Sequence, residues 1–96
     1  MNDNELRNLL TGRIIEAYGF DAGLRVANVL LPSVLTDFAM VMNKAKEGET
    51  AKEDYQTDDR KVIIHLEGIR KGAPGNKQNY QITEVLFNGN KVEIGQ

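Results

Sequence analysis

The 96-residue chain has no cysteine and no tryptophan, and only one histidine. Without cysteine it can form neither a disulfide bridge nor a thiolate metal site, and it has no thiol nucleophile. The first residues are polar and acidic, so the basic segment followed by an apolar one that begins a secretory signal is absent. We therefore expect a cytoplasmic protein.

The overall composition sets further limits. The chain is 41% hydrophobic and 27% charged with a net charge of -2, which is typical of a globular domain and not of a disordered or strongly basic one. Its length suits one core. We expect a single domain over residues 1–96.

The first half of the chain has the period of an α-helix. A first helix is predicted over residues 3–18, with leucines and isoleucines on one face. Asn2 and Glu5 form a capping pair at its start, and Gly19 ends it. A second helix is predicted over residues 22–46. The short connection predicts an antiparallel helical hairpin.

The second predicted helix is apolar around most of its circumference, as a central core helix is. Its seam consists of Leu24, Ala27, Leu31, Val34, Phe38, Val41 and Ala45. Pro32 interrupts the segment at a cost of about 3 kcal/mol, so either one helix runs through with a kink or a third helix begins at Pro32. The segment also contains Arg25, Asn28 and Asp37, which are costly in hydrocarbon, so we do not expect it to span a membrane.

The next segment, residues 47–59, carries six acidic side chains against one lysine. This composition predicts a solvated linker. The glycine and spacing of a calcium-binding loop are missing from it.

After residue 60 the period changes to two. Residues 61–70, 80–87 and 91–95 alternate or are rich in β-branched side chains, and Asn88 and Gly89 form the typical pair of a two-residue hairpin turn. The predicted fold is therefore α+β: an N-terminal antiparallel helical hairpin packed on a C-terminal three-stranded antiparallel meander.

The predicted sheet is apolar on both faces, although two helices can cover only one of them. The face expected to remain uncovered carries Ile63, Ile69, Tyr80, Ile82 and Leu86. Surplus apolar surface indicates an interface. We expect a homo-oligomer, most simply a dimer, and a protein partner.

Few residues indicate catalysis. His65 lies in the middle of a predicted strand beside Glu67, and a metal site or general base there would need partners that the sequence does not place nearby. Glu84 and Glu93 would lie opposite each other across the Asn88 turn, without a nucleophile or pocket. We expect no metal, no cofactor and no enzymatic activity, with an enzyme based on His65 and carboxylates as the least favoured alternative.

One loop has the composition of an anion-binding site. Glycines free the backbone to approach a ligand and cations surround them, although the order of a Walker loop is absent. The candidate residues are Arg70, Lys71, Gly72, Gly75, Asn76 and Lys77. A solvated hairpin tip explains the same residues, and in that case their charges contribute little to folding.

Residues 14–31 also have the order of a helix-turn-helix, but its recognition helix would carry Arg25 as its only early cation, which argues against DNA binding. The favoured function is a small self-associating, non-enzymatic binding module, such as an inhibitor, adaptor or accessory factor, that acts by protein contact. The alternative is a binder of nucleic acid, a nucleotide or another phosphate-bearing ligand through residues 70–77.

Overall fold

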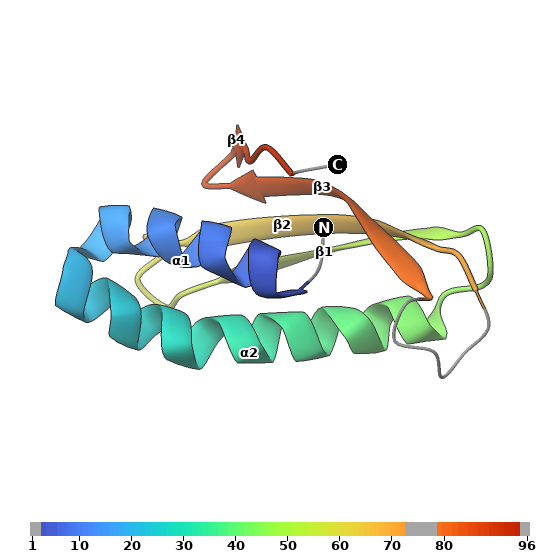
Figure 1. Cartoon of the computed structure of the whole chain (residues 1–96), viewed down its shortest axis with the longest axis horizontal. Helices are drawn as coiled ribbons and strands as arrows, with labels where there is room; N and C mark the ends of the chain where they lie inside the picture. Colours follow the sequence, from blue (N-terminus) through green and yellow to red (C-terminus); the bar gives the residue numbers. More distant parts are fainter. Residues whose placement is uncertain (1–2, 73–78, 95–96) are drawn as a thin grey trace.

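Two helices form an antiparallel hairpin in the computed structural model, which describes residues 3–72 and 79–94 (Figure 1). Helix α1 spans Asp3–Tyr18 and helix α2 spans Phe20–Lys44. Gly19 joins them with φ of 89°, a left-handed conformation that glycine adopts without strain. The predicted helical hairpin is therefore present, and α2 begins two residues earlier than predicted.

Helix α2 is continuous through Pro32. Its buried positions recur every three or four residues, and they pack on α1 and on the sheet. They are Gly23, Ala27, Leu31, Val34, Phe38 and Met42. By length and hydropathy alone α2 could cross a membrane, and only 22% of its apolar window is buried inside the fold.

The sheet has four antiparallel strands in the order β1-β2-β3-β4. They are β1 (Thr50–Gln56), β2 (Ile63–Arg70), β3 (Tyr80–Phe87) and β4 (Asn90–Lys91). Most of the predicted acidic linker is thus an edge strand, which pairs with β2 from Thr50 opposite Ile69 to Gln56 opposite Ile63. The linker prediction was wrong because an edge strand with one solvated face can be rich in charge.

The β3–β4 turn has the predicted form. Asn88 and Gly89 both have positive φ, Phe87 pairs with Asn90, and the Val92 N–H donates to the Val85 carbonyl at 2.9 Å. Strand β4 ends at Lys91 and not at residue 95. Glu93 therefore lies outside the ladder, and the residue opposite Glu84 is Glu67 of β2.

A β-bulge divides the pairing of β2 with β3. Glu67 pairs with Glu84 but Gly68 pairs with Ile82, so Thr83 is an extra residue on β3. The extra residue reverses which side chains face the helices beyond that point, and Tyr80 and Ile82 pack on the core. The prediction that they share a face with Ile63 and Leu86 was wrong for this reason.

The core lies between the helical hairpin and one face of the sheet (Figure 1). The sheet contributes the alternate side chains of β2 and β3, together with Val62 and Val92, and α1 contributes Leu6, Leu10 and Ile14. Among the residues that the structure describes, no element covers the opposite face of the sheet, which we call the open face.

Candidate binding site on the open sheet face

The open face follows from strand alternation. Its central strand β2 presents Ile63, His65, Glu67 and Ile69, because Val62, Ile64, Leu66, Gly68 and Arg70 are buried on the helix side. The neighbouring strands add Lys52 and Asp54 of β1, Glu84 and Leu86 of β3, and Lys91 of β4. Polar groups thus occupy the middle of the face, and isoleucines lie at both ends of β2.

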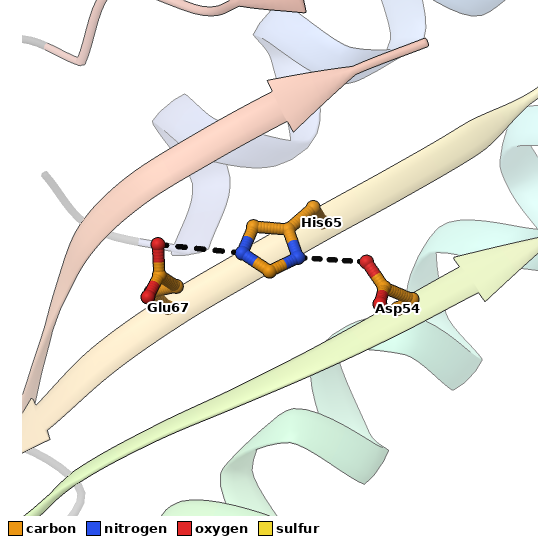
Figure 2. A network of polar contacts seen from close by, with 3 residues as sticks. All are labelled: Asp54, His65 and Glu67. Carbon is orange, nitrogen blue, oxygen red and sulfur yellow. Dashed lines mark hydrogen bonds and ion pairs between the residues drawn. The ribbon is translucent and has the colours of Figure 1, made fainter. Parts of the chain in front are cut away.

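His65 is at the centre of a polar network on this face (Figure 2). Its Nδ1 lies 2.7 Å from Asp54 Oδ1, and its Nε2 lies 3.3 Å from Glu67 Oε2. The His65 side chain is only 21% exposed, whereas Asp54 is 71% exposed. The sheet ladder fixes this arrangement, because Asp54 is the β1 residue directly opposite His65.

The network favours a positive charge at its centre. The hydrogen bond to Asp54 raises the pKa of His65 above its usual value, the contact with Glu67 adds to the rise, and partial burial opposes it. Glu84 is a further acidic neighbour, because donor atoms of His65, Glu67 and Glu84 all lie within 4.8 Å of one another. Three carboxylates therefore surround one imidazole.

The geometry does not supply the parts of a nucleophilic centre at this network. The only serine of the chain, Ser33, lies in α2, on the other side of the sheet. The network can hold a proton or a cation between its imidazole and its carboxylates. That the chain is not an enzyme stays a prediction.

The Arg70 side chain is buried, unlike that of its neighbour Lys71. It is only 2% exposed, and its Nη1 donates to the carbonyls of Met42, Asn43 and Ala45 at 2.8–2.9 Å. Its Nε donates to the Gly72 carbonyl at 2.8 Å. The guanidinium closes the carboxyl end of α2, where carbonyls lack helical partners, so it is not free to bind an anion in this structure.

The other loop candidates divide into two groups. Lys71 is exposed and Gly72 is half-buried. Gly75, Asn76 and Lys77 lie outside the described residues. Anion binding by this loop therefore stays a prediction, now without Arg70.

The predicted interface residues divide as well. Ile63, Ile69 and Leu86 are on the open face, whereas Tyr80 and Ile82 contact the core. Sequence reasoning missed Asp54 and Lys52 because it assigned them to a linker. Ala51 and Tyr55, four residues apart and thus on one side of a strand, were the signal available, since they are the partly buried positions of β1.

A separate hollow of about 590 Å³ lies between α2 and the β1–β2 turn, with Val26, Val29 and Leu30 on one wall and Gln56, Thr57, Asp58 and Asp59 on the other. Tyr18 borders it and donates its hydroxyl to Asp59 Oδ1 at 2.7 Å. Asp59 also accepts from Thr57 and from the Lys61 N–H. These bonds hold the β1–β2 turn against α1. The polar residues of the hollow thus have a structural role and do not by themselves indicate a ligand.

No family model matches the chain, and no curated protein or solved structure matches it either.

Proposed function

We propose that this chain is a small non-enzymatic binding module that associates with a second copy of itself through the open face. The observation that carries the proposal is the distribution of charged and apolar side chains on that face. A two-fold dimer needs a surface that is complementary to itself, and the open face meets this requirement around Leu66 of β2.

The central strand supplies the first pairs. A two-fold axis that crosses the strands at the level of Leu66 exchanges each residue of β2 with the one equally far on the other side of Leu66. It sets Ile69 of one copy against Ile63 of the other, and Glu67 against His65. Apolar groups thus meet apolar groups, and acid meets imidazole.

The edge strand follows the same symmetry. Glu53 of β1 is opposite Leu66 in the ladder, so the same axis exchanges Lys52 with Asp54. A lysine of one copy then faces an aspartate of the other. On β3 the axis sets Glu84 of each copy against Leu86 of the other, which is the one mismatched pair in this arrangement. Two sheets packed in this way lie ~10 Å apart, within reach of these side chains.

Charge reversal tests the proposed pairing. In Lys52→Glu an acid faces Asp54 of the second copy, and in Asp54→Lys a lysine faces Lys52, so each variant should dissociate at concentrations where the parent is a dimer. A mixture of the two variants should associate, because each copy then offers the charge that the other lacks. Sedimentation velocity on the separate and mixed variants measures this.

Matched apolar changes test the face itself. Ile63→Asp should produce monomers, whereas Val29→Asp, at a 76% exposed position on α2, should leave the parent assembly intact. A parent that stays monomeric at every concentration tested would overturn the proposal. So would a dimer that dissociates with Val29→Asp and persists with Ile63→Asp. The cytoplasmic location of the module stays a prediction.

A further inference from the structure

The two ring nitrogens of His65 have different hydrogen-bonding roles. Nδ1 lies 2.7 Å from Asp54 Oδ1, and a carboxylate only accepts hydrogen bonds, so Nδ1 carries the proton of this bond. In a neutral ring Nε2 is then an acceptor. It nevertheless faces Glu67 Oε2 at 3.3 Å, which is also an acceptor. The contact is favourable only when a proton or a metal ion lies between Nε2 and Oε2.

Glu84, on the adjacent strand, adds a second carboxylate that a positive charge at this position would stabilise. Glu67 and Glu84 are directly opposite in the β2–β3 ladder, where like charges destabilise a sheet. Their oxygens and a His65 nitrogen lie within 4.8 Å of one another, and all three side chains are half-buried. One proton on Nε2 satisfies one carboxylate, whereas a divalent cation satisfies both and the ring.

We infer that His65, Glu67 and Glu84 form a binding site for one divalent cation of the zinc type. The donor set is one imidazole nitrogen and two carboxylate oxygens, which suits Zn²⁺ and Co²⁺ and, in a single copy of the chain, leaves a coordination position open to solvent. Asp54 is a positioning residue, because its hydrogen bond to Nδ1 directs the Nε2 lone pair toward the site. This inference does not rest on the proposed dimer.

The charged surroundings are mixed. Lys52 of β1 is opposite Glu67, and Lys91 of β4 is opposite Leu86. These two cations lie on the same face as the site and lower its affinity for a metal ion. We therefore expect a micromolar dissociation constant for Zn²⁺, so that the site exchanges its ion readily and is not permanently occupied.

The single histidine makes the test unambiguous. Zn²⁺ alone is titrated into tag-free protein at neutral pH, and the imidazole ¹⁵N signals of His65 are followed by NMR. We expect the Nε2 signal to shift with saturation at one ion per chain, while Nδ1 keeps its proton. Co²⁺ should give a visible absorption band that Zn²⁺ removes. A Nε2 signal that does not respond to a large excess of Zn²⁺ would overturn the inference.

Four variants separate the roles. His65→Gln and Glu84→Gln remove donors and should each weaken Zn²⁺ binding at least tenfold. Asp54→Asn should weaken it about tenfold and change the tautomer reported by the ring nitrogens. Glu93→Gln, an exposed change outside the cluster, should leave the affinity unchanged. Equal Zn²⁺ affinity in the parent and in His65→Gln would refute the site.

The dimer and the metal site can fail separately. The same titration is repeated in Ile63→Asn, which disrupts the apolar pair without adding a charge beside the site, is expected to be monomeric, and keeps all four residues of the network. Unchanged Zn²⁺ affinity in that variant supports a site within one chain. Loss of binding only in the monomeric variant would show that the second copy completes the site, contrary to this inference.

Discussion

Arg70 is a charged residue whose role is structural. Its guanidinium is almost fully buried and donates to three carbonyls at the end of α2 and to one in its own loop. Sequence reasoning placed it with Lys71 at an exposed tip, because the carbonyls that it contacts belong to residues 42–45, about 25 positions earlier in the chain. Backbone acceptors leave no signature in the sequence.

Replacing Arg70 should therefore lower stability, contrary to the expectation for an exposed tip. Arg70→Ala leaves several buried carbonyls without donors and should lower the free energy of unfolding by about 3 kcal/mol. Lys71→Ala, the exposed neighbour, should change it by less than about 0.5 kcal/mol. Urea denaturation of both variants measures the difference. Equal midpoints would contradict a buried, structural role for Arg70.

Gly23 and Gly12 form a second matched pair. A Cβ at Gly23 would lie 2.5 Å from the Ile15 backbone Cα, whereas one at Gly12 meets nothing within 4 Å. Gly23→Ala should force the helices apart and destabilise the fold by roughly 1–3 kcal/mol. Gly12→Ala should stabilise it by up to about 1 kcal/mol, because alanine has the higher helix propensity. Thermal unfolding of the two variants should show shifts of opposite sign.

Tyr55 links β1 to α2 through its hydroxyl, which donates to Asp37 Oδ2 at 2.7 Å. Partial burial, followed by this bond to a carboxylate, raises the pKa of Tyr55 well above its usual value. The folded state thus holds a proton that the unfolded chain releases near pH 10. Stability should be complete below that pH and fall as pH rises above it.

Tyr55→Phe removes this contribution and should flatten the loss of stability between about pH 10 and 11. The flattening is expected to be partial, because burial also raises the pKa of Tyr80. Urea midpoints at neutral and alkaline pH measure the effect. The same pH dependence in parent and variant would show that the proton of the Tyr55 hydroxyl is not responsible for the alkaline loss of stability.

At the scale of elements, the sequence predicted the helices and the last turn, because hydrophobic periodicity and turn residues determine them. The apolar spacing of residues 3–18 and 22–46 predicted both helices, and the Asn88–Gly89 pair predicted the last turn and its register. Strand β1 was missed because its charged side chains are those of an edge strand. The bulge at Thr83 was missed because an extra residue changes the facing of side chains without changing composition.

The contact between α2 and the sheet depends on Phe38. Its side chain is fully buried and meets Tyr80 edge to face, with ring centroids 6.0 Å apart. Phe38→Ala should cost about 3–5 kcal/mol, and Phe38→Leu should cost clearly less because it retains most of the volume. Denaturation midpoints that are unchanged in both variants would contradict a core position. If the alanine variant fails to fold, the leucine variant still measures the contact.

At the scale of the whole molecule, one layer of helices covers one face of the sheet, and the network of Asp54, His65 and Glu67 lies on the other face (Figure 2). Core and candidate site are thus separated by the thickness of the sheet. Changes on the open face can alter binding with little effect on packing. The sequence could not predict this network, because Asp54 joins it only through the register of β1.

The strand order has a consequence for how fast the chain reaches this structure. Each strand pairs with the strand next to it in sequence, and α1 packs on α2, its neighbour in the chain. Strand pairing and the helical hairpin therefore close short loops, whereas the core contacts of α1 with β3 close long ones, and folding at a rate between those of helical bundles and β sandwiches is expected. Stopped-flow refolding should show a single phase on the millisecond scale. Arg70, which joins β2 to the end of α2, spans a longer loop, so Arg70→Ala should mainly accelerate unfolding and leave the refolding rate nearly unchanged.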